Sequence, residues 1–240
     1  MTKIIRYTPR YLCMLSDYGS PELHRHLAAH IVCAADGLLQ CTVGGSHMEC
    51  RGIMIRSDVP HEIRADSRMI VFLLASTSRM AERMEERCLS GAASAPIPEE
   101  TAVQIREIFA AGQADPDEAI LRTLGIFDTA SIPADARVLA AIAQIEQAQT
   151  IGTDMMERLC ETACLSQSRL SHLFRAETGN TLAGFLAFMK MRRAFEYAER
   201  GMNLTDAAMY AGFDSSSHLA ATCKRMFGIS LSAFLRSQKG

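Results

Sequence analysis

Four histidines are spaced in a way that could build a binding pocket. The stretch GSPELHRHLAAHIVC places His24, His26 and His30 at even intervals, and IRSDVPHEI adds His61 after a turn. Alternate residues of a β-strand point to the same side, so a strand through the first stretch puts its histidines on one face. Neutral imidazole suits zinc-like or nickel-like divalent ions and also donates hydrogen bonds to organic molecules. The pattern therefore predicts an effector pocket for a metal ion or an organic ligand.

The cysteines point to thiols rather than to a disulfide framework. The chain has eight cysteines and no CxxC pair, which favours a reducing compartment. Cys33, Cys41 and Cys50 add thiols near the histidines, although Cys33 is expected on the opposite strand face. We expect most cysteines to fill the core.

Length and composition indicate an ordinary globular protein with two domains. The chain has 240 residues, 48% hydrophobic and 22% charged, without Trp; single cores stop growing at about this size. The beginning of the sequence lacks the apolar core of a signal peptide, and the longest apolar run, MIVFLLA, is too short to cross a bilayer. These features predict a cytoplasmic protein that does not enter a membrane.

The charges are divided unevenly along the chain. Residues 151–240 contain 11 Lys and Arg against 8 Asp and Glu, a net charge of +3, whereas the preceding residues contain 14 against 19, a net charge of −5. A basic end joined to an acidic body is a weak indication of phosphate binding.

The elements that must position these residues change type along the chain. Short apolar runs such as HIVCAA, LLQCTV, GIMI and MIVFLLA, separated by turn residues, predict a small antiparallel sheet or barrel over the first 75 or so residues. From residue 76 the period becomes helical, with Met80 and Met84 on one face. Residues 93–98 are typical of a linker, helices are predicted at about 99–111, 116–125 and 134–147, and everything after Thr150 is predicted to be helical.

One short pattern occurs twice, 49 residues apart. SRLSHLFRAETG at 168–179 returns as SHLAATCKRMFG at 217–228, and each copy follows a short helix and a tight turn. This is the pattern of a helix-turn-helix. The local chemistry fits: small residues in the turn, serines that cap the second helix, and glycines that end it. These positions are Cys164 and Gly212, Ser166 and Ser215, and Gly179 and Gly228.

The segment between the two copies has a length that suits DNA. TLAGFLAFMKMRRAFEYAER spans 181–200, and as one helix it would be about 30 Å long, close to the roughly 34 Å of a B-DNA turn. Such a helix could hold two recognition helices in successive major-groove segments. Any all-α domain can contain two similar hairpins, but two copies in register around a helix of matching length favour DNA binding.

The paired motif resembles the DNA-binding domain of AraC-type transcription regulators. The similarity covers about residues 135–238 and is strongest in AGFDSSSHLAATCKRMFGISLSAF. The resemblance implies base-facing positions at Gln167, Ser168, Ser171 and His172 in the first recognition helix and at Ser216, Ser217 and Ala221 in the second, with phosphate contacts from Arg169, Arg175 and Lys224.

The sequence also departs from the family pattern. Ala221 stands where members often carry a long polar side chain, and it offers only van der Waals contact to a thymine methyl. Lys190 replaces a usual Arg, which loses a bidentate fork. Leu231 replaces a usual Pro at the start of the last helix.

Residues 15–75 or so resemble the cupin barrel that commonly precedes this DNA-binding domain, in which an HxH strand and a later PH face one pocket. The Glu expected after HxH in metal-binding cupins is absent, with His30 near its place, and the second motif opens with CR at 50 and 51. The resemblance leaves open whether His24, His26, His30 and His61 bind a divalent metal or serve an organic effector.

Together these observations predict an α+β multidomain protein. Residues 1–76 form a small cupin-like β-barrel that senses an effector, 77–130 a helical linker used for dimerisation, and 131–240 an all-α domain with two helix-turn-helix motifs. The expected function is a homodimeric regulator that binds double-stranded DNA and a small-molecule or metal effector, without catalytic residues. The alternatives are a metallo-cupin enzyme with a helical interaction tail, and a thiol-based redox sensor, which rests only on the cysteine count. The effector, the operator and the sign of regulation stay open.

Overall fold

The computed structural model describes residues 3–7, 11–16, 23–25, 28–74, 78–112, 115–127 and 134–227, with the side chains of 3–7, 199 and 227 outside this description. The chain forms two compact units, one built around residues 1–128 and the other around residues 129–224. Of the helices within the described ranges, none combines the length and apolar content needed to span a membrane.

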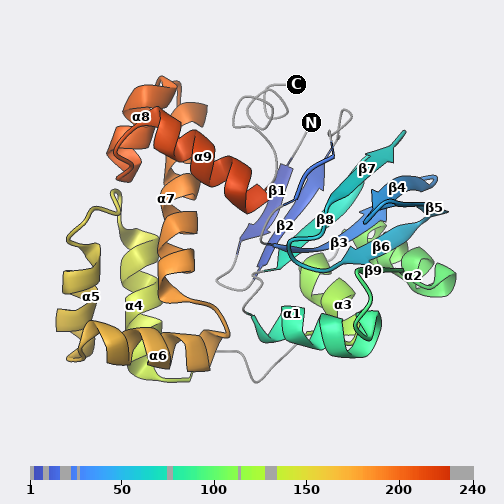
Figure 1. Ribbon diagram of the computed structural model, residues 1–240. Coiled ribbons are helices and arrows are strands. Elements are labelled where there is room, and N and C mark those ends of the chain that lie inside the picture. Colours follow the sequence, from blue (N-terminus) through green and yellow to red (C-terminus); the bar gives the residue numbers. More distant parts are fainter. Residues whose placement is uncertain are drawn as a thin grey trace. The chain divides into compact units, whose positions relative to one another are not determined.

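The described part of the first unit contains two antiparallel sheets (Figure 1). The larger has the strand order β1-β2-β8-β3-β6-β9, with bounds Lys3–Tyr7, Tyr11–Ser16, Met69–Leu74, Ala29–Ala34, Gly52–Ile55 and Ser94–Pro96. The smaller has the order β5-β4-β7, with bounds Ser46–Cys50, Leu39–Val43 and His61–Ala65. The predicted β-rich N-terminal region is confirmed.

The larger sheet is buried on both faces. Every residue of β2, β3, β6 and β8 is buried, which explains their continuous apolar runs. One face carries Ala29, Ile31 and Cys33 of β3, which share a core with residues of three helices. These helices are α1 (Arg79–Met84, followed by one π-helical turn over Glu85–Leu89), α2 (Glu99–Ala110) and α3 (Pro116–Thr123). The opposite face carries His30 and Val32, which line a cavity together with residues of β7.

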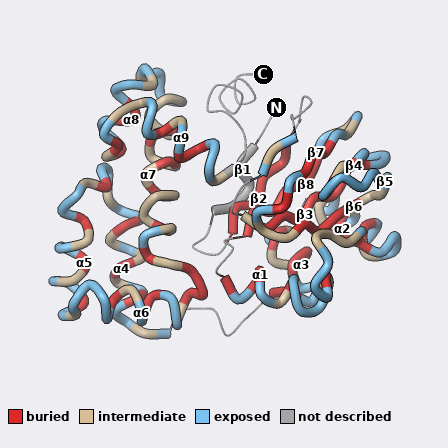
Figure 2. The backbone as a smooth tube through the Cα atoms, viewed as in Figure 1, coloured by how far each residue is buried: buried red, intermediate tan, exposed pale blue. Residues whose placement is uncertain are grey.

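The smaller sheet has one buried and one solvent-facing side. In β4, Leu39, Cys41 and Val43 are buried, whereas Gln40 is exposed, the alternation expected for a half-buried strand. Figure 2 shows the same contrast, with buried residues along the larger sheet and exposed residues along β4 and β5.

Two segments differ from the expectation. Residues 93–98 are not a plain linker, because β9 pairs with the edge strand β6 from Ile53↔Pro96 to Ile55↔Ser94. The helices between residues 79 and 123, assigned from the sequence to a separate linker, pack their apolar sides on the sheet through residues such as Met84, Ile105 and Leu121. Their use in dimerisation stays a prediction.

The second unit is helical in its described residues. Its elements are α4 (Ala136–Gln147), α5 (Met155–Ala163), α6 (Gln167–Thr178), α7 (Leu182–Glu199), α8 (Leu204–Ala211) and α9 (Ser216–Phe227). Its core contains Leu159, Leu170 and Phe174, all fully buried, and Phe174 stacks on Phe185 of α7 at 5.6 Å between ring centroids. The predicted all-α C-terminal region is confirmed.

Candidate DNA interface and histidine pocket

Three of the four predicted histidines meet in the first unit, but by a different route from the one expected. The strand predicted through residues 24–30 is wrong in that form, because β3 begins only at Ala29. His24 instead pairs with His61 in an isolated antiparallel bridge: the His61 N–H donates to His24 O at 2.8 Å, and the His24 N–H donates to His61 O at 3.1 Å. His26 lies outside the described residues.

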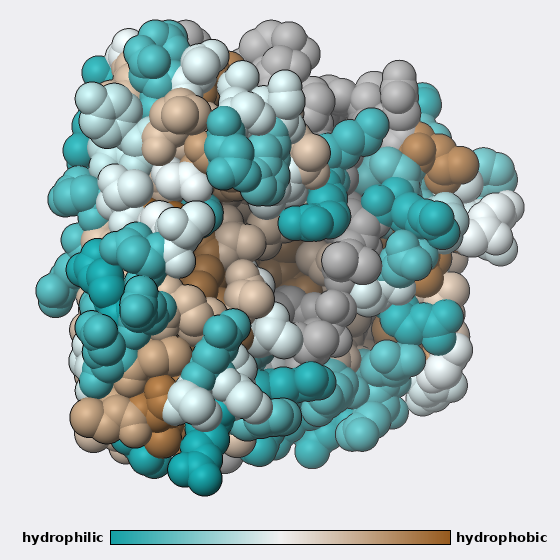
Figure 3. Space-filling model, turned by 60° about the vertical axis from the view of Figure 1, so that its left-hand side comes forward, coloured by the Kyte–Doolittle hydropathy of each residue, from teal (hydrophilic) through white to brown (hydrophobic). Residues whose placement is uncertain are grey.

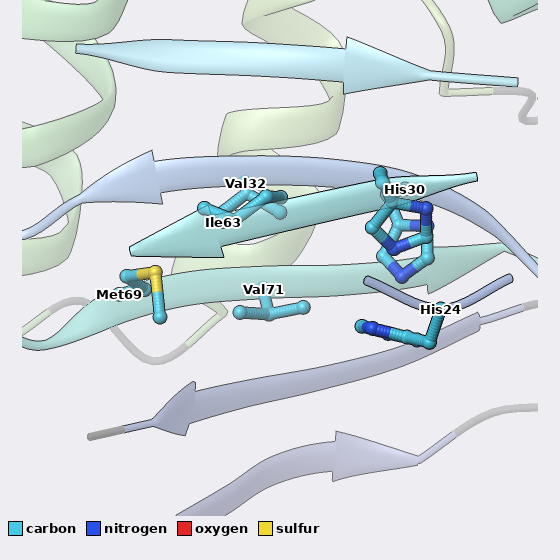
Figure 4. Close-up of a pocket in the computed structure, with 7 residues that line it drawn as sticks. His24, His30, Val32, Ile63, Met69 and Val71 are labelled. Carbon is cyan, nitrogen blue, oxygen red and sulfur yellow. The ribbon is translucent and has the colours of Figure 1, made fainter. Parts of the chain in front are cut away.

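The three imidazoles form a contiguous cluster. The His61 ring lies 4.6 Å from the His24 ring and 4.5 Å from the His30 ring, between centroids. His30 and His61 are buried. In Figure 4, His24 and His30 lie at one end of a cavity and Met69 at the other. Val32, Ile63 and Val71 line the apolar remainder of the cavity, whose enclosed volume is about 20 Å³.

His61 is held in its neutral form. Burial lowers the pKa of His61 to about 4, with a further lowering from the neighbouring His24, and these outweigh the hydrogen bond to Val59. That bond joins His61 Nδ1 to the carbonyl oxygen of Val59 at 2.7 Å. Since a carbonyl oxygen only accepts, Nδ1 carries the proton and Nε2 has the lone pair. A neutral imidazole therefore lies beside the apolar walls of the pocket.

The described residues give no direct support for a metal centre. No group of three or more His, Cys, Asp or Glu side chains among them has an arrangement that could hold a metal ion. Because His26 is not among them, the predicted four-histidine set is untested.

In the second unit, the first repeated motif has helix-turn-helix geometry. Cys164 ends α5 in the left-handed conformation, with φ of 51°. Ser166 precedes α6, and its hydroxyl accepts a hydrogen bond from the Arg169 N–H at 3.5 Å. Gly179 ends α6 with φ of 71°. The turn, cap and stop predicted for this copy are confirmed.

The second motif repeats this construction. Gly212 ends α8 with φ of 102°, and the Ser215 hydroxyl accepts from the His218 N–H at 3.1 Å at the start of α9. Asn203 caps α8 by accepting from the Asp206 N–H at 2.9 Å. Gly228 and Leu231 lie outside the described residues, so the predicted stop and the expected effect of the missing Pro are untested.

A single loop, residues 148–152 between α4 and α5, is held by the long helix α7. The Arg193 Nε donates to Ala148 O at 2.8 Å, and its Nη2 donates to Glu146 O. The Tyr197 hydroxyl donates to Gln149 O at 2.8 Å. Arg193 also pairs with Glu196 on its own helix. These contacts satisfy carbonyl groups at the end of α4, which have no partner within the helix.

The same loop also contacts the second helix-turn-helix. The Ile151 N–H donates to Ala211 O at 3.2 Å, and Lys190 of α7 donates to Gly212 O at 2.9 Å. A Cβ atom on Gly212 would lie 2.1 Å from Ile151 O, so the two backbones meet closely at a position that only glycine permits. We call the 148–152 loop with Lys190, Arg193 and Tyr197 the clasp. It fixes α8 against the α4–α5 connection, while α7 runs between the two motifs (Figure 1).

A comparison with protein families identifies this region. A family model described as a helix-turn-helix domain matches residues 159–237, from within α5 past the end of α9. The chain carries an AraC-type helix-turn-helix domain. No curated protein sequence matches the chain significantly.

Solved structures similar to this chain share little sequence with it. ToxT from Vibrio cholerae O395 aligns over 96% of this chain and 97% of its own, with a TM-score of 0.49 and 10% identity. Wild-type ToxT from Vibrio cholerae strain SCE256, with a bound unsaturated fatty acid, aligns over 97% of each chain, with a TM-score of 0.42 and 9% identity. An RmlC-like cupin from Shewanella frigidimarina aligns over 31% of this chain and 74% of its own, with a TM-score of 0.27 and 12% identity.

The predicted contact residues of the AraC-type domain lie mostly on its solvent-facing surface. In α6, Gln167, Ser168, Arg169, His172 and Arg175 are exposed and Ser171 is half-buried. In α9, Ser217, Ala221 and Lys224 are exposed and Ser216 is half-buried. Exposure is what a groove-reading role requires, and the contacts to bases and phosphates stay predictions.

Exposed positive charges accompany these positions. Within the described ranges, Arg169, Arg175, Lys224 and Arg225 have no carboxylate within ion-pair distance, whereas Arg192 and Arg193 pair with Glu196. Figure 3 shows hydrophilic residues spread over the face of this unit that is turned forward, with smaller hydrophobic areas between them.

Two further exposed residues of α9 lie next to the predicted contact positions and were not predicted from the sequence. Arg225 follows Lys224 directly, and His218 follows Ser217. The His218 Nδ1 lies 3.1 Å from an Asp214 carboxylate oxygen, and its ring meets Phe213 edge-on at 5.3 Å between centroids. The available signal was the acidic Asp214 directly before the capping Ser215, at the start of the helix whose first turn carries His218.

Proposed function

We propose that this protein is a transcription regulator that binds double-stranded DNA through α6 and α9 and binds a small effector in the histidine pocket. The observation that carries the proposal is the clasp within an AraC-type domain. Two helical hairpins that were similar only by chance would not need hydrogen bonds that hold them in a fixed arrangement. Here one loop is hydrogen-bonded to the helix between them and to the second motif.

The length of α7 supports a role in spacing the motifs. Its 18 residues correspond to about 27 Å, somewhat less than the 30 Å expected from the sequence. A turn of B-DNA is about 34 Å, and recognition helices one turn apart enter successive major-groove segments on one side of the duplex. α6 packs near the start of α7 through Phe174 and Phe185, and α8 packs along the second half of α7, where Lys190 binds Gly212 and Tyr197 contacts Tyr210.

The charges define the expected binding energetics. Arg169, Arg175, Lys224 and Arg225 are exposed cations without carboxylate partners in the described residues. Four phosphate contacts give a slope of about −3.6 for the logarithm of the binding constant against the logarithm of salt concentration. Base reading then falls to the other exposed positions, with Gln167, Ser168 and His172 contributing hydrogen bonds.

The pocket favours a small organic effector with one polar group. Its polar end consists of His24, His30 and His61, and its remaining wall consists of Val32, Ile63, Met69 and Val71. The enclosed space is about 20 Å³, which holds about one water-sized group, so we expect the apolar walls to move apart when an effector binds. His61 is neutral at physiological pH, so its ring makes this end of the pocket polar without adding a charge.

A divalent metal is the second candidate for this pocket. Its support is residue chemistry, because imidazole is a ligand that zinc-like and nickel-like ions prefer; the described imidazoles are not arranged to hold an ion by themselves, so this candidate depends on His26. Metal analysis of the purified protein and of His26→Ala separates the two. Stoichiometric metal that is lost in the variant supports the ion, and a metal-free wild-type protein supports the organic effector.

Selection of bound sequences from a random DNA pool, with the purified full chain, tests DNA binding directly. We expect enrichment of a motif with two half-elements about one helical turn apart. A protein with Arg169 and Lys224 both changed to Ala is the matched control, because both side chains are exposed and their loss leaves the core intact. Failure of the wild-type protein to enrich any sequence, while its far-ultraviolet spectrum is that of a folded helical protein, would refute the proposal. Homodimer formation, measured by sedimentation, is a further expectation.

A further inference from the structure

Two cysteines of the first unit lie side by side in the β4–β5 hairpin. Leu39 pairs with Cys50 and Cys41 pairs with Met48 in the register of the two strands. Paired residues, and alternate residues of one strand, point to the same side. Cys41 and Cys50 are therefore diagonal neighbours on the face that buries Leu39, and their side chains are hydrogen-bonded to each other.

The two thiols occupy unequal environments. Cys41 is buried, and its pKa is raised because it donates the hydrogen bond to Cys50 and is desolvated. Cys50 is half-buried, and its pKa is lowered because it accepts from Cys41 and from the Gly52 N–H, against the opposing effect of burial. Hydrogen bonds to the sulfur favour the thiolate. The more accessible cysteine is thus the better nucleophile, with a protonated partner beside it.

Solvent reaches this hairpin. A groove open to solvent lies against β4, β5 and β7 and is lined by Gln40, Cys41, Thr42, His47, Met48, Glu49, Glu62 and Arg64. Most of these residues belong to the sheet face opposite the two thiols, so a small oxidant must reach the pair at Cys50, which is only half-buried.

The third nearby cysteine is in a different position. Cys33 of β3 belongs to the core between the larger sheet and the helices, and burial raises its pKa to about 12. It stays protonated and inaccessible at neutral pH, so it can serve as a control.

We propose that Cys50 and Cys41 form a peroxide-reactive dithiol, in which Cys50 attacks the oxidant and Cys41 resolves the product. The Cys50 thiolate attacks one oxygen of hydrogen peroxide, the O–O bond breaks, and Cys50 sulfenic acid and hydroxide form. The Cys41 sulfur then attacks the Cys50 sulfur, the S–O bond breaks, and a disulfide and water form. Overall, two thiols lose two electrons and peroxide is reduced to two waters.

The expected disulfide is strained and therefore reversible. Diagonal neighbours in an antiparallel pair have Cα atoms about 7–8 Å apart, and a disulfide needs less than about 6.8 Å, so the strands must approach by about 1 Å. Strained disulfides are more easily reduced. Since β4 also pairs with β7 from Val43↔His61 to Leu39↔Ala65, this movement is transmitted to the strand that bears His61.

Peptide mapping tests the proposal on the reduced full chain. The protein is treated with one equivalent of hydrogen peroxide, blocked with N-ethylmaleimide and cleaved after Glu and Asp. Glu49 lies between Cys41 and Cys50, and Asp36 lies between Cys33 and Cys41, so the three cysteines fall on separate peptides. We expect the Cys41 and Cys50 peptides to stay joined, at about 2 Da below the sum of the free thiol peptides, and to separate after dithiothreitol.

Variants assign the roles. Cys41→Ser should accumulate a Cys50 sulfenic acid that dimedone traps, Cys50→Ser should abolish the link, and Cys33→Ser should leave it unchanged. In the wild-type protein, Cys50 should react with peroxide faster than Cys164, which is more exposed. Unlinked peptides, a link to Cys33 instead, or Cys50 reacting no faster than Cys164 would each overturn the proposal, and the last comparison needs no variant.

Discussion

Replacing Gly212 with Ala tests whether the clasp fixes the second helix-turn-helix. The new methyl group would lie 2.1 Å from Ile151 O, at a residue whose φ is 102°. A positive φ costs a non-glycine residue about 1–2 kcal/mol. The clash forces the loop away and weakens the Ile151–Ala211 and Lys190–Gly212 hydrogen bonds, each worth about 1 kcal/mol. We expect the free energy of unfolding to fall by about 3–4 kcal/mol.

Gly201→Ala is the matched control. Gly201 also has a positive φ, of 93°, but a Cβ atom there would meet nothing within 4 Å. Only the backbone strain remains, so the expected loss is about 1–2 kcal/mol. Both variants are compared by urea unfolding of the full chain, followed by circular dichroism at 222 nm with separate fits for separate transitions.

DNA binding gives a second readout for the same pair of variants. Below the unfolding transition, Gly212→Ala should lose affinity for a selected two-element site while keeping its affinity for random DNA, because its phosphate-binding cations are untouched. Gly201→Ala should bind both DNAs as the wild type does. Equal destabilisation by the two substitutions, or unchanged binding to the selected site by a folded Gly212→Ala protein, would refute the role of the clasp.

Three further predictions concern single side chains. Arg193→Ala removes a charged hydrogen-bond donor from the end of α4 and should lower the free energy of unfolding by about 2–3 kcal/mol. The control is Arg158→Ala, which removes an exposed ion pair with Asp154 and should cost about 0–1 kcal/mol. Equal losses for the two variants in urea unfolding would contradict this prediction. The pKa of His61 is about 4 in the folded protein, against an ordinary value of 6.5. Between pH 6.5 and pH 4 the unfolded chain therefore binds a proton at His61 that the folded protein does not bind. The free energy of unfolding falls for this reason by about 3 kcal/mol from pH 7 to pH 4. His61→Gln should flatten that part of the stability curve, and an unchanged slope would show that another group titrates. Lys224→Ala should weaken binding to all DNA sequences alike and reduce the salt slope by about 1, whereas His172→Ala should relax specificity at one position at a cost of about 1–3 kcal/mol; identical losses on specific and random DNA for both variants would count against these roles.

The helix-turn-helix motifs were predictable because their signals are local. Ser166, Ser215 and Gly212 cap or end helices through hydrogen bonds and backbone angles within a few residues, so the sequence itself carries the information. The clasp was not predictable. Arg193 and Tyr197 bind backbone carbonyls more than 40 residues away. Every residue has a backbone carbonyl, so the residue types do not indicate which one accepts the hydrogen bond.

In the first unit, too, local features were predictable from the sequence, whereas contacts between distant segments were not. The apolar runs of β3 and β8 were recognised, but β9 was missed because a short strand containing Pro96 becomes a strand only through its pairing with β6. His24 and His61 meet through a bridge between distant segments rather than through alternation along one strand. Likewise, the hydrogen bond between Cys41 and Cys50 depends on the hairpin register, which a one-residue shift would change.

The two recognition helices are unequal in the chemistry that they offer to DNA. The exposed side of α6 carries Gln167, His172 and Arg175, whose side chains are long enough to reach base edges. The corresponding side of α9 carries Ser217 and Ala221, which offer one hydroxyl and one methyl group. A helix of short side chains discriminates bases weakly, but Lys224 and Arg225 next to it still contribute phosphate contacts. We therefore expect α6 to specify the sequence and α9 to fix the register, a division that functions only if the distance between them is constant. The clasp meets this requirement, because its hydrogen bonds hold the 148–152 loop against α7 and against the end of α8.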